Sequence, residues 1–375
     1  MLYVVLFSLI ISSVAGRCSR VVCLIDNRND PKDFIPDKVP KDYCTHIIYA
    51  SADIEGNTLK NQFSYELNTK QKKGLYAKFT GLKRVKSDLK TLLRVTTPWG
   101  SAGPFSKMVS TKDNRKAFIE NVIAFLARYK FDGLDIDWLY PTQHGGSSED
   151  KPNFSAFLKE ASEAFSSNST PSGSSRFLLS ATVHSSNFQF YDVPALGRYL
   201  DMVNVMTFML RGPWDGVMDH HSPLFGNYGV VNRMGMWKHN GIPVNKLNIG
   251  VVFFGLYAHV QSKTDSSRGG RIVNVEKPLY TPYSSGRLPF VEICKLATDQ
   301  NNVHWDESLK APYFFKDGLW LGYDTVSSVG IKANIGAYYG YGFWIETLQL
   351  DDYNGTMCNM GKFPYTRHIF SGCGM

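Results

Sequence analysis

"FDGLDIDWLYP" (residues 131–141) sets carboxylates at regular intervals in an apolar run. Successive side chains of a β-strand point to opposite faces, so Asp135, Asp137 and Leu139 are predicted to share one face. The apolar residues between them then share the other face. Two carboxylates on a buried strand are costly without partners, and each raises the proton affinity of the other, which is typical of catalytic clefts. We therefore favour a buried strand that carries a functional site over an ordinary surface strand.

Further apolar runs of strand length occur along the chain, with helical patterns between them. In order, the eight runs are RVVCLI, THIIYA, TLLRVT, GLDIDWL, FLLSATV, MVNVMTF, LNIGVVFF and IGAYYGYGFWI. Apolar residues with helical spacing fill 114–130 and 151–165, on either side of the fourth run. Eight strands with intervening helices predict a closed (β/α)₈ barrel.

Residues 256–316 interrupt this pattern with a segment rich in Gly, Ser, Tyr and Pro. The segment is longer than an ordinary loop between a strand and a helix. We therefore predict an inserted subdomain there, with the barrel built from residues 17–255 and 317–375.

The first sixteen residues, MLYVVLFSLIISSVAG, form an apolar run that ends in small residues. This is typical of a signal peptide, and no later segment reaches the length of a membrane-spanning helix. We therefore expect a secreted, extracellular protein. Sequons at Asn153, Asn168 and Asn354 fit a glycoprotein.

The chain contains six cysteines, an even number that indicates disulfide bonds in an exported protein. None of them lies in a metal-binding spacing, so we expect no metal site, and no motif points to a cofactor.

The chain carries 41 Lys and Arg against 33 Asp and Glu, a net charge of +8. Its densest basic stretch is residues 68–90, for which a solvated helical face is the favoured interpretation. The alternative is binding of sulfated glycans. The residues for that alternative are Lys70, Lys72, Lys73, Lys83, Arg84 and Lys86. Aromatic residues do not interleave with this stretch, so a nucleic-acid partner is not expected.

Several motifs together resemble the chitinases and chitinase-like proteins of glycoside hydrolase family 18. In order, they are YCTHIIYA (43–50), FDGLDIDWLYP, DKPNFSAFLKEA, YLDMVNVMTF, SPLFG, KLNIGV, VEIC and APYFF…WLGYD. The resemblance covers nearly the whole chain after the signal peptide. It implies a TIM barrel with an α+β insertion after the seventh strand.

The resemblance also implies how the family's enzymes work, through the motif DGxDxDWEYP. The glutamate of that motif protonates the glycosidic oxygen, and the acid two residues earlier orients the acetamido group of the substrate. Leu139 stands at the glutamate position, so the motif is degenerate and only Asp132, Asp135 and Asp137 remain. Loss of a positioned general acid removes about 10² to 10⁴ in rate. We therefore expect a pseudoenzyme with no catalytic residue.

Other cleft positions that the resemblance assigns are also altered. The aromatic residue after the first strand falls at Arg28, and the third-strand GGW falls at 96–98, with Trp99 one step away. The sixth-strand MTYD is MTFM here, so a tyrosine hydroxyl is lost at Phe208 and a carboxylate at Met209.

Near the end of the barrel, the family's YGR becomes FGL at 254–256. If Asp351 and Asp352 anchor the last strand as in the family, the tryptophan that floors the central subsite falls at Glu346. Trp344 lies two residues earlier on the same strand face. Sugar rings stack on aromatic faces, so these losses weaken a standard chitin site.

Three functions remain open. The favoured one is a catalytically inactive lectin that binds chito-oligosaccharide or another glycan. Its candidate ligand-binding residues are Trp99, Asp137, Tyr140, Met206, Trp214 and Trp344. The second is a secreted growth-factor-like or signalling scaffold that binds a cell-surface receptor and no chitin. The third is an enzyme that has recruited Glu346 as its acid. The simpler interpretation of Glu346 is a solvent-facing residue at the rim of the barrel.

Two disulfide bonds are implied by the resemblance, Cys23–Cys44 and Cys294–Cys358. Cys18 and Cys373 then remain. A closed barrel brings the ends of its chain together, so we predict a third bond between these two cysteines.

Overall fold

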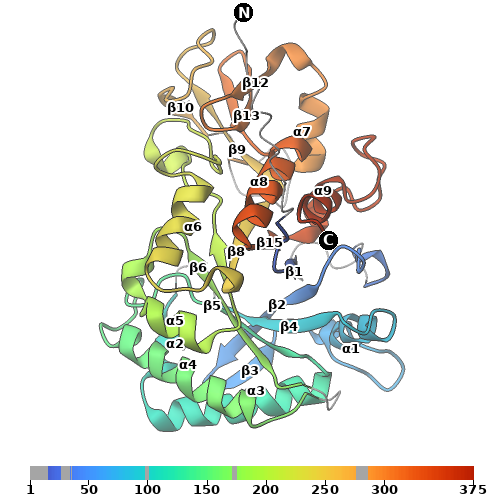
Figure 1. Ribbon diagram of the computed structural model, residues 1–375, viewed down its shortest axis with the longest axis vertical. Helices are drawn as coiled ribbons and strands as arrows, with labels where there is room; N and C mark the ends of the chain where they lie inside the picture. The colour runs from blue at the N-terminus through green and yellow to red at the C-terminus, as the bar shows by residue number, and fades with distance from the viewer. Residues whose placement is uncertain (1–15, 27–33, 35, 98–100, 171–174, 276–285) are drawn as a thin grey trace, which may run out of the picture.

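Eight parallel strands close into a barrel in the computed structural model, which describes residues 16–26, 34, 36–97, 101–170, 175–275 and 286–375 (Figure 1). The barrel strands are β1 (Val21–Asp26), β2 (His46–Glu55), β4 (Lys90–Val95), β5 (Gly133–Asp137), β6 (Leu178–His184), β7 (Met202–Met206), β8 (Leu247–Val252) and β15 (Gly342–Glu346). Closure follows because β1 pairs with both β2 and β15. The predicted (β/α)₈ barrel is thus confirmed.

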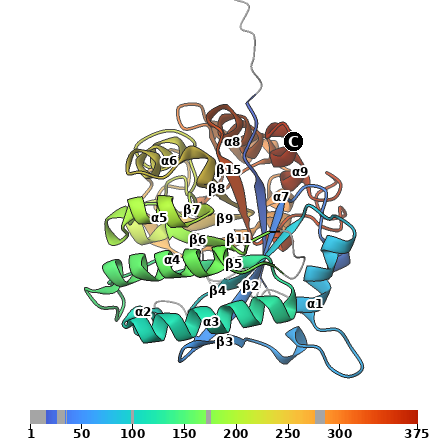
Figure 2. The ribbon, with the colours of Figure 1, turned by 60° about the horizontal axis from the view of Figure 1, so that its bottom comes forward.

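Helices surround the barrel, as Figure 2 shows for α3, α4 and α5. Their bounds are α1 (Leu75–Thr80), α2 (Gly103–Val109), α3 (Lys112–Tyr129), α4 (Asp150–Ser166), α5 (Val193–Tyr199), α6 (Val230–His239), α8 (Val326–Tyr339) and α9 (Pro364–Gly372). The short strand β3 (Thr58–Asn61) pairs antiparallel with β2. Residues 1–15 of the expected signal peptide, Arg28, Pro98 and Trp99 lie outside the described residues.

The alternation predicted for residues 131–141 is present in β5. Leu134 and Ile136 point outward into the large core between strands and helices. Trp138 packs outward on Phe105, with ring centroids 5.1 Å apart. Asp135 points into the barrel, where a smaller apolar cluster and a polar network fill the interior.

The eighth predicted run was only partly a strand. Residues 335–339 of IGAYYGYGFWI belong to helix α8, which ends at Gly340 with a positive φ of 78°. Strand β15 begins at Gly342. Tyr338 and Tyr339 are 75% and 42% exposed at the end of this surface helix, whereas Phe343 and Trp344 are buried in β15.

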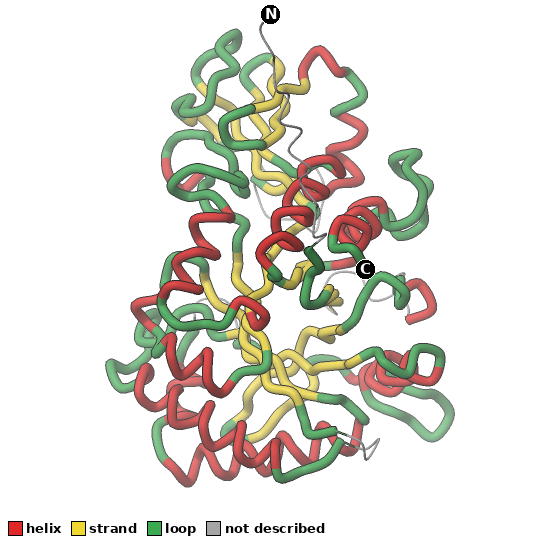
Figure 3. Tube along the Cα trace, viewed as in Figure 1, coloured by secondary structure: helices red, strands yellow, loops and turns green. Residues whose placement is uncertain are grey.

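An antiparallel sheet follows the seventh barrel strand and forms the end of the molecule opposite α3 (Figures 1 and 3). Its strands are β9 (Phe254–Val260), β10 (Ile272–Asn274), β11 (Arg287–Pro289), β12 (Val303–Asp306), β13 (Ala311–Lys316) and β14 (Leu319–Gly322), and helix α7 (Phe290–Leu296) accompanies them. The predicted range 256–316 lies inside this subdomain. The sheet is wider because β14 returns to pair with β9, with Leu319 opposite His259.

Three disulfide bonds fasten the fold, and they are the pairs expected from the sequence. Their Cα–Cα distances are 4.9 Å for Cys18–Cys373, 5.9 Å for Cys23–Cys44 and 5.8 Å for Cys294–Cys358. Within the described ranges, no helix has the length and hydropathy of a membrane span. The same residues contain no cluster of three or more His, Cys, Asp and Glu able to hold a metal ion.

The sequence analysis interpreted the basic stretch, residues 68–90, as one solvated helical face. The structure does not form such a face. Lys70, Lys72 and Lys73 lie in an exposed loop before α1, and Arg84 lies in the short 3-10 helix η3 (Gly81–Arg84). Lys83 is used structurally, because its Nζ lies 2.8 Å from Asp132 Oδ1. The chain therefore spreads these charges over a loop and two short helices.

Candidate functional site

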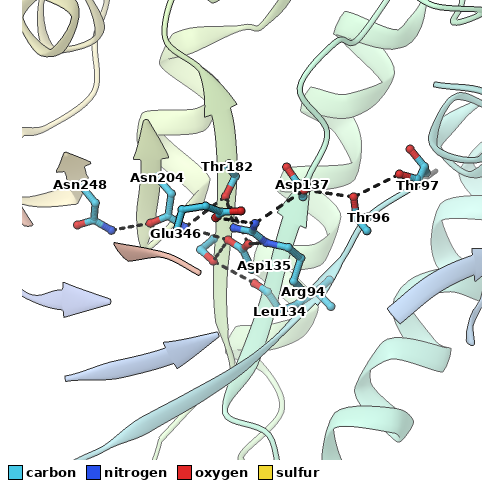
Figure 4. A network of polar contacts seen from close by, with 11 residues as sticks. Arg94, Thr96, Thr97, Leu134, Asp135, Asp137, Thr182, Asn204, Asn248 and Glu346 are labelled. Atoms are coloured by element: carbon cyan, nitrogen blue, oxygen red, sulfur yellow. Dashed lines mark hydrogen bonds and ion pairs between the residues drawn. The ribbon is translucent and has the colours of Figure 1, made fainter. Parts of the chain in front are cut away.

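Asp135 of β5 is fully buried at the centre of a polar network inside the barrel (Figure 4). Its Oδ2 accepts a hydrogen bond from Arg94 Nε at 2.7 Å. Its Oδ1 accepts from Ser180 Oγ at 2.6 Å and from Asn204 Nδ2 at 3.1 Å. Both oxygens are thus engaged by donors, which come from strands β4, β6 and β7.

Arg94 of β4 is the cation of this network, and the sequence analysis did not identify it. Its guanidinium lies 3.5 Å from Glu346 Oε2 and 3.8 Å from Asp137 Oδ2, in addition to Asp135. Its Nη2 donates to Thr182 Oγ1 at 2.6 Å. Burial lowers the pKa of Arg94, but the charges of the three carboxylates raise it overall. The sequence signal was an arginine inside the apolar run TLLRVT.

Asp137 lies at the carboxyl end of β5, where active sites form in barrels of this type. Thr96 Oγ1 donates to its Oδ2 at 3.2 Å. Its side chain is 19% exposed, so this carboxylate reaches the barrel mouth, defined here as the surface formed by Thr96, Asp137, Tyr140, His184 and Met206. A second carboxylate with its own donors therefore lies beside the first.

Leu139 and Tyr140 follow Asp137 and are both partly exposed. Leu139 adds no titratable group to the barrel mouth. The Tyr140 ring lies 4.8 Å from that of His144 and 5.7 Å from that of His184. Burial and the negative charge of Asp137 raise the pKa of Tyr140. Tyr140 is thus a neutral hydroxyl beside the carboxylates.

Met206, at the end of β7, is partly buried against the inner cluster of the barrel. Phe208 follows it, is 4% exposed and lies 5.7 Å from the ring of Trp344. Met209 Sδ accepts a hydrogen bond from Arg287 Nη2 at 3.4 Å. An apolar ring and a thioether therefore occupy positions where the resemblance expected a hydroxyl and a carboxylate.

Trp344 is not an exposed platform for sugars, contrary to the expectation from its strand face. It points into the barrel as expected, but it is only 1% exposed. Phe208 covers it, and the Arg94 guanidinium lies 5.2 Å from its ring centroid. The sequence thus predicted the strand face of Trp344 correctly but not its burial. Trp344 lies deeper in the barrel than Glu346, which ends β15.

Trp214 is the candidate that the structure leaves open to solvent, at 57% exposed. It lies in the 3-10 helix η5 (Pro213–Asp215), in the long loop that follows β7. Trp99 lies outside the described residues. The barrel mouth thus brings Asp137, Tyr140 and Met206 together.

Glu346 and Asp132 differ in position from the other acids. Glu346 lies at the end of β15, is 24% exposed and pairs with Arg94, so it is more than a solvent-facing rim residue. Asp132 precedes β5, at the opposite end of the strand from the barrel mouth, and accepts from Thr91 N at 2.7 Å. Asp132 is therefore a structural carboxylate.

The three predicted sequons lie at the molecular surface. Asn168 and Asn354 are exposed, and Asn153 is partly exposed in the first turn of α4. Attachment of glycans to them stays a prediction.

Comparison with known proteins shows which family the chain resembles. The sequence pattern of glycosyl hydrolases family 18 matches residues 20–345. The oviduct-specific glycoprotein of Ovis aries is 32% identical over 362 residues, which cover 93% of this chain and 66% of the sheep protein. The chain therefore spans slightly less than two thirds of that relative's length.

Two solved structures resemble the fold closely. Human YKL-39, described as a pseudo-chitinase with retained chitooligosaccharide binding, is 28% identical with a TM-score of 0.83, over 95% of this chain and 100% of that one. Catalytic domain 2 of an Ostrinia furnacalis group II chitinase was solved as a glutamate-to-leucine mutant in complex with a chito-oligosaccharide, (NAG)5. It is 29% identical with a TM-score of 0.83, over 93% of this chain and 95% of that domain.

Proposed function

Because the chain belongs to glycosyl hydrolase family 18, we propose that it is a secreted, catalytically inactive chitinase-like protein that binds glycans as a lectin. The proposal has two parts, the loss of hydrolysis and the retention of binding. The first part is supported by the polar network around Arg94, and the second by Trp214 together with groups of the barrel mouth.

The arrangement around Arg94 is the observation that carries the loss of hydrolysis. A general acid must hold a proton near neutral pH, which enzymes achieve by burial or by a neighbouring negative charge. Here Leu139 supplies no proton. Asp135, Asp137 and Glu346 all pair with the buried Arg94, at 2.7 to 3.8 Å. Glu346 pairs with the same arginine, which argues against it as a replacement acid.

Retained binding is supported by the exposed aromatic and polar groups that remain. Trp214 offers a ring face to a sugar, and such stacking is a main source of affinity in glycan clefts. At the barrel mouth, Asp137 and Tyr140 supply an acceptor and a hydroxyl. Human YKL-39 is described as both a pseudo-chitinase and a chitooligosaccharide binder, so the two properties coexist in a related barrel.

Calorimetric titration with a chitin hexasaccharide tests this proposal. We expect micromolar binding to the intact protein and a loss of about tenfold or more in Trp214→Ala, since a stacked ring contributes more than 1 kcal/mol. Tyr338→Ala is the matched control, because Tyr338 is an exposed aromatic residue on α8. Absence of heat at millimolar sugar, or equal losses in both variants, would contradict the proposal.

A signalling scaffold that binds no chitin is the second candidate. The burial of Trp344 favours it, because this removes one of the aromatic platforms expected in the cleft. Failure of every chitin fragment to bind, together with saturable binding of the protein to cell surfaces, would favour this function over the lectin.

A further inference from the structure

Three arginines are buried in the described chain, and two of them have carboxylate partners. Arg94 has the three acids of the barrel interior. Arg115 donates to Glu160 twice, from Nε at 2.9 Å and from Nη2 at 2.8 Å. Arg233, 9% exposed in the first turns of α6, has no carboxylate within ion-pair distance among the described residues.

The polar contacts of Arg233 are correspondingly poor. Its Nη1 donates to Met236 Sδ at 3.6 Å, and its Nε has no hydrogen-bond partner in the part of the chain that the structure describes. An arginine cannot shed its charge near neutral pH. A buried charge without a charged partner is costly, so an anion bound at this site would be stabilising.

A second arginine contacts the same aromatic ring as Arg233, that of Tyr228. The guanidinium carbons of Arg233 and Arg211 lie 5.1 and 4.8 Å from the centroid of Tyr228, which is 47% exposed. Arg211 is 3.4 Å from Asp215, but its Nε makes no hydrogen bond within the described residues. Two cations and one carboxylate leave this cluster with a positive charge.

The cluster is continuous with the proposed glycan site. Arg211 and Asp215 flank the exposed Trp214 along the loop after β7. Arg233 in turn lies near His184, whose pKa is lowered by burial and by the charge of Arg233. The ring of His184 lies 5.7 Å from Tyr140. The cluster therefore extends from the loop that carries Trp214 to His184 of the barrel mouth.

We propose that this end of the cleft binds a saccharide that carries an anionic substituent, a carboxylate or a sulfate, with the anion at Arg233 and Arg211 and a sugar ring on Trp214. Guanidinium groups match the planar or forked oxygens of such anions and bind them bidentately. The net charge of +8 adds a long-range attraction for the same ligands. This inference rests on the proposed glycan binding at the same cleft and names the class of glycan.

Three hexasaccharide probes separate the alternatives. Neutral chitin hexasaccharide has no charge, a hyaluronan hexasaccharide carries carboxylates, and a chemically sulfated chitin hexasaccharide carries sulfates. We expect at least one charged probe to bind about tenfold more tightly than the neutral one at about 50 mM salt, and the advantage to shrink at about 300 mM. The charged probe that gains more identifies the anion.

Matched variants locate the binding. Arg233→Met and Arg211→Met should each weaken the charged probe about fivefold or more and leave the neutral probe within about twofold. Arg128→Met is the control, since Arg128 lies 5.4 Å from the Tyr129 ring on the exposed end of α3. The double variant Lys72→Met/Lys73→Met controls for the basic loop. Neither control should change the affinity for any probe.

The outcomes separate this inference from the proposed function. Equal affinity for neutral and charged probes overturns the inference and leaves the lectin proposal standing. Loss of charged-probe binding in either control, or none in the Arg233 and Arg211 variants, also overturns it. Absence of binding by all three probes contradicts both. Thermal unfolding checks the variants, because Arg233→Met removes a buried charge and should not lower the unfolding midpoint.

Discussion

At the scale of residues, Arg94 joins the acids of the barrel interior into one polar network. It is opposite Asp135 in the register of β4 and β5, and Asp135 is opposite Ser180 in the register of β5 and β6. The carboxylate therefore receives donors from both neighbouring strands. One guanidinium group thus lies among three carboxylates, those of Asp135, Asp137 and Glu346.

Restoring a glutamate at position 139 should not restore hydrolysis. In Leu139→Glu the new carboxyl would follow Asp137, which lies 3.8 Å from Arg94, and the polar groups lost at Phe208 and Met209 would still be missing. We expect no release of the fluorophore from a methylumbelliferyl chitobioside, as for the uncharged Leu139→Gln control. Turnover by Leu139→Glu alone would refute the role given to Arg94.

Replacing Arg94 should be costly to the fold. Arg94→Met leaves Asp135 buried without its cation, and breaking a buried ion pair from one side typically costs about 3–5 kcal/mol. Urea unfolding measures this change in the free energy of unfolding. The exposed Arg128→Met should shift it by no more than about 0.5 kcal/mol. Similar stabilities for the two variants would show that the cluster is not needed by the fold.

The sequence indicated the acids of this site but not their partner. Regular spacing in residues 131–141 predicts which side chains of one strand share a face. The contact of Arg94 with Asp135 depends instead on the register between two strands separated by helix α3, and a single strand does not specify that register. The unpaired Arg233 was missed for a related reason, since burial without a partner appears only when the fold is assembled.

At the scale of elements, β15 and the loop after β7 place their tryptophans differently. Trp344 lies within the barrel on β15, whereas Trp214 projects from η5 into solvent. A side chain on a strand is fixed by the barrel wall, and one on a loop can meet a ligand. The two residues should therefore separate stability from binding.

Trp344→Ala should destabilise the protein by about 3–5 kcal/mol, the usual cost of truncating a buried aromatic side chain. Trp214→Ala should change the free energy of unfolding by less than about 0.5 kcal/mol. Denaturant unfolding, with chitin hexasaccharide titration of the folded variants, checks both. A stable Trp344→Ala that has lost glycan binding would place this residue in the ligand site instead.

Element boundaries were predicted least well where composition misleads. The run IGAYYGYGFWI has the aromatic content of a strand, yet its first half continues α8 until Gly340 ends the helix. The basic stretch 68–90 has lysines at spacings that fit a helix, but its helices are only six and four residues long. In both segments tertiary packing overrides local pattern.

At the scale of the whole molecule, the partly buried His46 and the buried His221 make stability depend on pH. Burial, with smaller contributions from Arg20 and Lys90, lowers the pKa of His46 to about 3. Burial likewise lowers the pKa of His221 to about 3. The unfolded chain binds protons at these residues below about pH 6.5, and the folded chain does not.

The folded state should therefore lose stability as the pH falls from about 6.5 towards 3, by about 1–2 kcal/mol for each histidine near pH 5. Urea unfolding at about pH 7.5 and about pH 5 measures the loss. His221→Gln should reduce it, and the exposed His239→Gln serves as the control. A loss of equal size in both variants would show that other groups govern the acid sensitivity.

The architecture was predicted well because it depends on repetition along the whole chain. Strand runs separated by helical patterns specify a (β/α)₈ barrel even when individual boundaries are misplaced, and barrel closure explains why Cys18 meets Cys373. The insertion was recognised by its composition. The predicted range, 256–316, is narrower than the observed sheet because β9 and β14, which pair with each other, are as apolar as the barrel strands.

Native mass spectrometry of the protein after a day with chitin hexasaccharide tests the central claim most directly, because one spectrum reports both binding and cleavage. The account predicts a complex of the protein with the intact hexasaccharide and no shorter oligosaccharide, bound or free. Shorter products that accumulate with time, or a spectrum with no complex at excess sugar, would contradict it.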